Sequence, residues 1–321
     1  MSSDLVSVVI PVRNEAPFIE ATIGSILGQD YPGPIEVVVA DGMSDDGTRD
    51  ILDRLAAGDP RIRYVDNPTR RTPNGLNLAI AASRGDVIVR CDGHAELPPR
   101  YIGRAVELLA ETGAVNVGGV QHAEGVSWMQ RAIAFAMSSP IGVGDARFHY
   151  GGEAGPVDTV YLGVFRRDAL VAAGLFDETL TRNQDYELNI RLRDNGGVVW
   201  FDPTLRVTYR PRQTLGGLWR QYFQYGQWKR RVIRMHPGST RLRQLVPPLF
   251  VVALVVSLVV AFTPWRLLGA VVPGLYVAVL SLGTLRQLVK THDSAALGFP
   301  AAIATMHIAW ALGFLSPNMR I

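Results

Sequence analysis

Two residues whose types and spacing suit metal chemistry follow a short apolar segment. Asp92 and His94 come directly after residues 86–91, whose composition is typical of a buried strand. A turn after that strand can aim both side chains at one point. Carboxylate oxygens bind hard divalent cations, and imidazole suits softer ones such as Mn²⁺. The same residues also fit an ordinary strand end, in which Asp92 caps the next segment and His94 is solvated.

Two further carboxylates follow predicted strands in the same way. Glu15 comes after the apolar strand 5–12, and Asp41 ends the strand 35–40. Strands and helices alternate here, which predicts an α/β fold with a mostly parallel sheet and helices on both faces. Because the carboxyl ends of parallel strands share one edge, we expect Glu15, Asp41 and Asp92 around a single crevice. Their oxygens could accept hydrogen bonds from a ribose and a base.

Two common nucleotide-binding motifs are missing from the sequence. No Gly-x-Gly-x-x-Gly follows the first strand, and no Gly-x-x-x-x-Gly-Lys-Ser/Thr occurs. A dinucleotide-binding fold or a P-loop is therefore not expected, and a bound nucleotide would need a metal to neutralise its diphosphate. The helices expected around the sheet are 16–27, 49–56 with Thr48 as N-cap, 74–83 and 98–109.

Asp185 opens a helix that is predicted to end before Asn195-Gly-Gly. A carboxylate in the first helical turn is stabilised by the helix dipole, which would lower its pKa and keep it ionised. Such a group could serve as a general base. It could equally be a helix-stabilising residue with no role in chemistry.

The composition changes near Gln244, where three apolar stretches begin: 245–263, 267–285 and 295–317. Each reaches the roughly 20 residues that a helix needs to cross a bilayer. Basic residues precede the first stretch and also lie between the second and third, which predicts that these flanks are cytoplasmic. The N-terminus lacks the features of a signal peptide. We therefore expect a multi-pass protein of the cell inner (plasma) membrane, with a cytoplasmic first domain and the C-terminus outside.

Aromatic and basic residues interleave between Leu215 and Met235, a pattern typical of a helix lying in the membrane interface. An ordinary helix packed on the domain is the alternative. The predicted domains are a catalytic domain at 1–213, an interface helix at 214–243 and a transmembrane region at 244–321. The adjoining spans favour membrane lipid over nucleic acid as the partner of the basic residues. Cys91 is the single cysteine, which excludes an intrachain disulfide and fits a reducing compartment.

Together, the motifs of the first domain resemble those of the family 2 glycosyltransferases, which are inverting enzymes with a GT-A fold. The resemblance is closest to the membrane-attached branch that adds glucose during succinoglycan-type exopolysaccharide assembly, which also has a C-terminal helical membrane region. The segments that carry the resemblance are Val8–Glu15, Ala40–Thr48, Asn74–Ile80, Arg90–His94 and Asn183–Asp185.

The resemblance implies roles for individual residues. Asp185 would be the catalytic base, and Asp92 would hold the metal-bound diphosphate, with His94 beside it as a metal ligand. The other residues implied in nucleotide-sugar binding are Pro11, Arg13 and Glu15 around the base and ribose, Asp41 on the uracil ring, and Arg71 and Asn77 closing over the nucleotide.

The sequence departs from the family pattern at three places. His94 stands where the family usually has a second aspartate, and Gln184 replaces the glutamate of its Glu-Asp pair. The segment from Gln224 to Trp228 partly matches the acceptor-side Gln-x-x-Arg-Trp motif of processive synthases, but the arginine is missing. That loss weakens the case for a long-chain polymerase.

The resulting expectation is a membrane-bound inverting hexosyltransferase that uses Mg²⁺ or Mn²⁺. Its donor would be a nucleotide sugar, a UDP-hexose above all, and its acceptor a hydroxyl of a lipid-linked saccharide or a polysaccharide. One alternative is a polyprenyl-phosphate glycosyltransferase, whose anionic acceptor needs no base. Another is a non-catalytic membrane scaffold that binds nucleotides.

Overall fold

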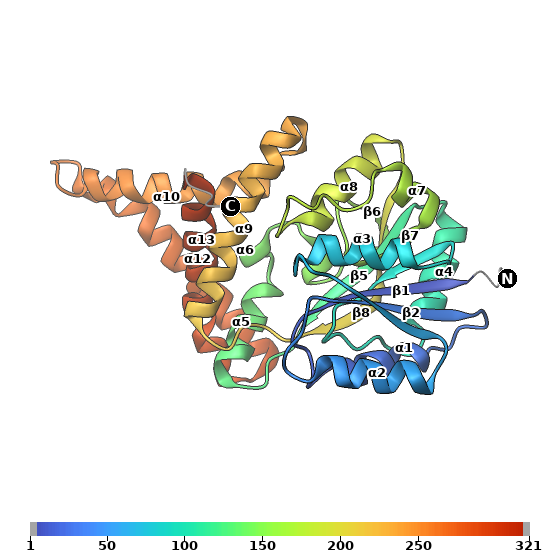
Figure 1. Cartoon of the computed structure of the whole chain (residues 1–321). Coiled ribbons are helices and arrows are strands. Elements are labelled where there is room, and N and C mark those ends of the chain that lie inside the picture. Colours follow the sequence, from blue (N-terminus) through green and yellow to red (C-terminus); the bar gives the residue numbers. More distant parts are fainter. Residues whose placement is uncertain (1–4, 317–321) are drawn as a thin grey trace. The chain divides into compact units, whose positions relative to one another are not determined.

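A computed structural model describes residues 5–316, and these divide into two compact units (Figure 1). The first, here the sheet unit, comprises residues 5–121 and 151–208. The second, here the helical unit, comprises residues 122–150 and 209–316. This division differs from the predicted boundary at residue 213, because the segment 122–150 packs with the C-terminal helices.

The sheet unit is built on one sheet with the strand order β3-β2-β1-β4-β7-β5-β8-β6. The strands β1, β2, β3 and β4 pair in parallel, whereas β7 is antiparallel to both β4 and β5, and β6 is antiparallel to β8. The strands are β1 (Val6–Val12), β2 (Ile35–Asp41), β3 (Ile62–Asp66), β4 (Val87–Arg90), β5 (Asn116–Ala123), β6 (Gly155–Pro156), β7 (Tyr161–Arg166) and β8 (Val199–Tyr209).

Helices cover both faces of this sheet, because successive residues of a buried strand point to opposite sides. Val8 and Ile10 of β1 pack with α1, α2 and α4, whereas Val9 packs on the other face with α3, α7 and α8. Figure 1 shows α3 on the opposite side of the parallel strands from α1 and α2. The helices are α1 (Ile19–Leu27), α2 (Thr48–Gly58), α3 (Thr72–Ala82), α4 (Tyr101–Thr112), α7 (Arg167–Ala172) and α8 (Gln184–Asp194).

One predicted helix start is wrong. Thr48 is the first residue of α2 rather than its N-cap, and the preceding Gly47 has a left-handed φ of 94°. The Thr48 hydroxyl is used instead by the loop before the helix, where it donates to Asp46.

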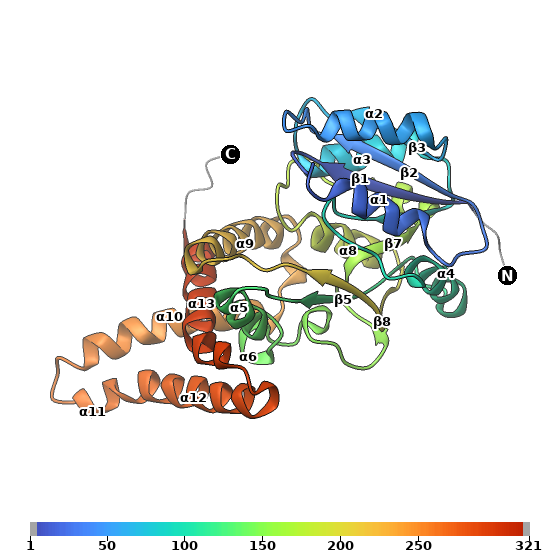
Figure 2. The same ribbon diagram turned by 90° about the horizontal axis from the view of Figure 1, so that it is seen from below.

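The helical unit contains α5 (Trp128–Met137), which the sequence did not lead us to expect, and α9 (Leu215–Met235), which was predicted, as were helices in the three apolar stretches that follow it. Figure 2 shows α10 and α12 as a hairpin with α11 at its turn. The remaining elements are α6 (Pro140–Val143), α10 (Leu242–Val260), α11 (Arg266–Gly269), α12 (Val271–Thr291), α13 (Phe299–Leu315) and short 3-10 turns at Arg147–His149, Pro237–Ser239 and Ser294–Gly298.

Within residues 5–316, three helical stretches are long and apolar enough to cross a membrane: Leu242–Val260, Arg266–Thr291 and Ser294–Leu315. In the third, 50% of the apolar window is buried inside the structure, against 17% in each of the other two. The reason is that α13 packs on α5 and α9 through a shared apolar cluster that includes Tyr222 and Met306. One face of the predicted interface helix is therefore covered by α13.

Two glycines allow α9 and α13 to approach closely. A Cβ on Gly226 would lie 2.1 Å from the Trp310 carbonyl oxygen, and a Cβ on Gly313 would lie 2.0 Å from the Phe223 carbonyl oxygen. Backbone atoms occupy both positions, so neither contact can be relieved by a side-chain rotation.

We expect Gly313→Ala to lower the thermal unfolding midpoint of the detergent-solubilised protein, because the added methyl must separate the two helices. Overpacking of this kind typically costs about 1–3 kcal/mol. The control is Gly274→Ala in α12, where a Cβ meets no atom within 4 Å. It should leave the midpoint unchanged or raise it. Equal midpoints for the two variants would show that α9 and α13 are not in contact at Gly313.

Candidate active site

The carboxyl ends of β2, β1 and β4 lie side by side at one edge of the sheet. In the register of the strands, Val12 pairs with Asp41 and Val9 pairs with Arg90. The segments that follow these strands carry Glu15 and Asp92. The structure therefore brings Glu15, Asp41 and Asp92 to the same edge, as the sequence predicted.

Asp41 is fully buried and held by neighbouring donors. The Ser44 hydroxyl donates to its Oδ1 at 2.5 Å, and Arg49 forms an ion pair with its Oδ2 at 3.3 Å. Arg49 also pairs with Asp66 on β3 at 2.8 Å. Asp41 thus fixes the loop that follows β2.

The loops after β1 and β2 are joined by hydrogen bonds. Asn14, with a left-handed φ of 58°, donates its backbone N–H to Ser44 Oγ at 2.9 Å. The backbone N–H of Glu15 donates to Thr48 Oγ1 at 2.9 Å. These bonds fix the backbone of Glu15. The neighbouring Arg13 is exposed, and its guanidinium makes no hydrogen bond or ion pair with any residue from 5 to 316.

His94 contacts Glu15 directly, with 2.9 Å between His94 Nδ1 and Glu15 Oε1. Gly93 makes this approach possible, because a Cβ there would lie 2.8 Å from Val12 Cγ1 and 3.0 Å from Glu15 Cγ. The imidazole and the Glu15 carboxylate therefore form a pair next to Asp92.

Arg90 joins Asp92 to Asp185, and the sequence analysis did not identify this role. Its Nη2 donates to Asp92 Oδ1 at 2.8 Å and its Nη1 to Asp185 Oδ2 at 2.5 Å. The Arg90 side chain is only 9% exposed. Burial by itself would lower the pKa of Arg90, but the charges of Asp185 and Asp92 raise it, so the guanidinium is a permanent cation. The sequence did contain one signal for this role, because Arg90 is a charged residue in an otherwise apolar strand.

Burial raises the pKa of Asp185, and the charge of Asp92 raises it further, although Arg90 acts in the opposite direction. We expected the helix dipole to lower the pKa of Asp185. This prediction is wrong, because the desolvation of the buried carboxyl outweighs the effect of the Arg90 charge. Asp185 Oδ1 is enclosed and has no hydrogen-bond partner within residues 5–316. One oxygen of this carboxylate is thus held by Arg90 and the other is unengaged.

The loop before α8 determines where Asp185 lies. The Asn77 amide donates to the Phe176 carbonyl at 2.9 Å and accepts from the Phe176 N–H at 3.0 Å. Arg191 donates to the Leu175 carbonyl at 2.7 Å. Asn77 thus anchors this loop, and its predicted contact with a nucleotide stays a prediction. Arg71 is exposed at the residue before α3.

Three other predicted site residues have different surroundings. Pro11 lies in β1 and pairs with Ala40. Gln224 and Trp228 belong to α9 of the helical unit, where Gln224 is exposed and the Arg231 guanidinium lies 5.4 Å from the Trp228 ring.

Within residues 5–316 there is no group of three or more His, Cys, Asp or Glu residues placed to hold a metal ion. Asp92 and His94 could still supply two ligands, because Asp92 Oδ2 makes no hydrogen bond in the described part of the chain. A Mg²⁺ ion commonly takes one or two carboxylates and completes its shell with phosphate oxygens and water. These residues therefore fit a cation that arrives with a diphosphate.

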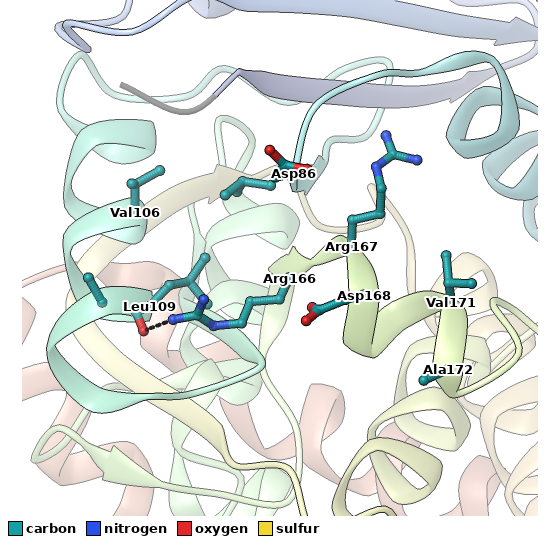
Figure 3. A pocket seen from close by; sticks show the side chains of 10 residues that line it. Asp86, Val106, Leu109, Arg166, Arg167, Asp168, Val171 and Ala172 are labelled. Atoms are coloured by element: carbon teal, nitrogen blue, oxygen red, sulfur yellow. Dashed lines mark hydrogen bonds between the residues drawn. The ribbon is translucent and has the colours of Figure 1, made fainter. Parts of the chain in front are cut away.

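A hollow of about 640 Å³ lies elsewhere, at the start of β4 beside Asp86 and Val87 (Figure 3). Arg166 points into this region and donates to the Leu109 carbonyl at 2.7 Å. Asp92 follows the opposite end of the same strand. The hollow is therefore separate from the edge of the sheet that carries Glu15, Asp41 and Asp92.

The chain matches known proteins over most of its length. The model of the family described as "Glycosyl transferase family 2" matches residues 7–172. The succinoglycan biosynthesis protein ExoA of Rhizobium meliloti is 35% identical over 323 residues, which cover 98% of this chain and 96% of the relative.

Two more distant proteins match along nearly the whole chain. A dolichyl N-acetyl-alpha-D-glucosaminyl phosphate 3-beta-D-2,3-diacetamido-2,3-dideoxy-beta-D-glucuronosyltransferase of Methanococcus voltae is 24% identical over 97% of this chain and 96% of its own. The solved structure of the mannosyltransferase PcManGT of Pyrobaculum calidifontis, in complex with GDP-Man and Mn²⁺, has a TM-score of 0.67. It is 20% identical and the match covers 98% of this chain and 88% of that one, which confirms the predicted fold.

The hydroxyl of Thr48 connects the loops after β1 and β2, and its loss should loosen them. In Thr48→Val, the Glu15 N–H loses its acceptor and the Asp46 carboxylate loses one of its donors, which should cost about 1 kcal/mol or more in the free energy of unfolding. Chemical denaturation would measure this. Thr208→Val in β8 is the control, because the Thr208 hydroxyl makes no hydrogen bond among the described residues. Equal stability of the two variants would contradict the proposed coupling of the loops.

Proposed function

This chain belongs to glycosyltransferase family 2, and we propose that it transfers a hexose from a nucleotide sugar to a hydroxyl group of a lipid-linked acceptor, with inversion. The observation that carries this proposal is the Arg90-linked pair of carboxylates. Asp92 fits a metal-bound diphosphate, and Asp185 keeps one oxygen unengaged beside it. Membership of an enzyme family leaves no reason to propose the non-catalytic scaffold.

In the proposed reaction, Asp185 Oδ1 accepts the proton of the acceptor hydroxyl while that oxygen attacks the anomeric carbon. The bond from the anomeric carbon to the diphosphate breaks, and the nucleoside diphosphate leaves with the electron pair. A raised pKa makes Asp185 a stronger base than an exposed carboxylate. A Mg²⁺ or Mn²⁺ ion held by Asp92 and His94 would neutralise charge on the departing diphosphate.

The nucleotide would lie along the loops after β1 and β2. The residues proposed to form its site are Pro11, Arg13, Glu15, Asp41, Arg71 and Asn77. Asp41 and Glu15 are held firmly by their neighbours, which suits recognition of a base and ribose, with Arg13 beside them. The exposed Arg71 is proposed to close over the nucleotide together with Asn77. We propose a UDP-hexose as the donor. Gln224 and Trp228 are proposed to contact the acceptor.

The acceptor is proposed to be lipid-linked because three helices are apolar enough to cross a membrane, and because the relatives' names include succinoglycan biosynthesis and transfer to a dolichyl-linked sugar phosphate. The basic residues that precede the first of these helices support the proposal that the sheet unit is cytoplasmic and that the helices lie in the plasma membrane. A polyprenyl phosphate is the less favoured acceptor. Its anion would be repelled by the unengaged oxygen of Asp185.

The direct test is a screen of the detergent-solubilised full-length protein against UDP-glucose, UDP-galactose, UDP-N-acetylglucosamine and GDP-mannose, with and without Mn²⁺. Extracted membrane lipids would supply the acceptor. The expected result is metal-dependent release of UDP from one UDP-hexose together with sugar incorporated into lipid. Release of GDP alone would contradict the proposal that the donor is a UDP-hexose. Absence of any turnover would contradict the proposed function.

Asp92→Ala should abolish the metal-dependent part of UDP binding, because it removes the proposed carboxylate ligand. Calorimetry with UDP and Mn²⁺ would measure the affinity. Asp86 precedes β4 at the end of the strand opposite to Asp92. Asp86→Ala is therefore a matched control that should leave the affinity for UDP and Mn²⁺ unchanged. Unchanged affinity in Asp92→Ala would show that this residue does not hold the metal.

Asp185→Asn should bind UDP and Mn²⁺ nearly as well as the wild type but transfer sugar about 10²–10⁴ times more slowly. Since burial raises the pKa of Asp185, the wild-type rate should rise with pH through a value above that of an ordinary aspartate, and the variant should lack this limb. Asp194→Asn, at the exposed end of the same helix, is the control. Wild-type transfer by Asp185→Asn would leave Asp185 as a helix-stabilising residue and favour the phosphate acceptor.

Three crossings would place the C-terminus on the outer side of the membrane. A phosphatase reporter fused after the last residue should therefore be active, and a cytoplasm-specific reporter at the same place should be inactive. The reverse pattern would indicate an even number of crossings.

A further inference from the structure

We infer that Arg90 is a positioning residue that holds Asp92 and Asp185 relative to each other and leaves one oxygen of each carboxylate without a hydrogen-bond partner among residues 5–316. The inference rests on the proposed function, to which it adds a residue that contacts neither sugar nor metal. It starts from the two hydrogen bonds of one buried guanidinium.

Arg90 engages a single oxygen of each carboxylate. It bonds Oδ1 of Asp92 and Oδ2 of Asp185. The other two oxygens, Asp92 Oδ2 and Asp185 Oδ1, make no hydrogen bond with any residue from 5 to 316. Arg90 therefore determines which oxygen of Asp92 can meet a cation and which oxygen of Asp185 can meet an acceptor hydroxyl.

The same contact joins two distant parts of the chain. Arg90 ends β4, and Asp185 lies in the first turn of α8, 95 positions later. Among the described residues, no other side chain bonds the Asp185 carboxylate. Among the residues from 5 to 316, Arg90 is thus the side chain that links the Asp92 carboxylate directly to the Asp185 carboxylate.

Charge explains why this position needs a cation. One positive and two negative charges leave a net negative charge at the cluster, which suits a divalent cation. Without Arg90, two carboxylates would face each other in a partly buried site and repel. The cation therefore offsets this repulsion and allows the two carboxylates to lie close together.

Geometry explains why the cation is arginine. The planar guanidinium offers two terminal nitrogens in a fixed fork, so one side chain can bond two carboxylates in separate directions. Lysine carries the same charge on one flexible nitrogen and cannot reproduce both contacts. A shift of about 1 Å in a catalytic group can cost about 10²-fold in rate. Arg90→Lys should therefore retain charge but lose alignment.

A double-mutant cycle separates positioning from a merely structural ion pair. The variants are Arg90→Lys, Asp185→Asn and the combination, each as full-length protein in detergent. The measurement is UDP release from UDP-glucose with Mn²⁺, or the preferred donor if the screen returns another one. We expect Arg90→Lys alone to slow turnover about 10²-fold. In the Asp185→Asn background it should add less than about threefold, because the base to be aligned is already gone.

Two further measurements define the baseline. The affinity for UDP with Mn²⁺ should change less than the turnover rate in Arg90→Lys, which places the loss in the chemical step. Arg104→Lys is the matched control, because Arg104 lies on α4 of the same unit and pairs with Glu107 and Asp202 rather than with site carboxylates. Its turnover should stay within about twofold of wild type.

Each outcome decides the inference. Wild-type turnover by Arg90→Lys, or an equal fold-loss in both backgrounds, would overturn it. If Arg90→Lys does not fold, Arg90→Gln takes its place in the cycle, and if neither folds, Arg90 is a structural residue and the inference is wrong. A wild-type protein that turns over no nucleotide sugar would instead contradict the proposed function, and this inference with it.

Discussion

A buried guanidinium between two carboxylates is the interaction on which the site depends. Burying Arg90 costs solvation free energy, and the cost is offset because both Asp92 and Asp185 accept its hydrogen bonds. Removing either carboxylate would leave charge in the interior with one partner fewer. The end of β4, the turn at Asp92 and the start of α8 are therefore constrained together, although they lie far apart in the sequence.

The remaining contacts make this arrangement rigid. Hydrogen bonds from Asn14 and Glu15 join the loops after β1 and β2. Asn77 anchors the loop that leads into α8. The parallel strands provide the edge and the loops are fixed to one another, so the carboxylates converge before any ligand arrives. Such preorganisation is what electrostatic stabilisation of a leaving diphosphate requires.

The sequence predicted those parts of the structure that follow from local pattern. Alternating apolar strands and helices indicated the sheet and the edge where Asp41 and Asp92 lie, and the residues from Leu215 to Met235 form a helix as predicted. Helix α5 was missed, although Ser127 and Gln130 form a capping box that the sequence could have signalled.

Contacts between distant residues could not be predicted in this way. Arg90 occurs in a recognisable motif, but its partner Asp185 is 95 positions away, and nothing local indicates the pair. The predicted direction of the Asp185 pKa shift was wrong for the same reason. Burial depends on tertiary packing, whereas the helix dipole is local. Packing likewise places residues 122–150 with the C-terminal helices.

The proposed role of Asp185 is to activate an acceptor hydroxyl for a single displacement at the anomeric carbon. The most direct test is the anomeric configuration of the sugar in the product, determined by proton NMR after transfer from an α-linked UDP-hexose. One displacement assisted by a base inverts that centre, so we expect a β-linked product. An α-linked product would contradict it, because retention requires a different reaction course in which Asp185 is not simply a base.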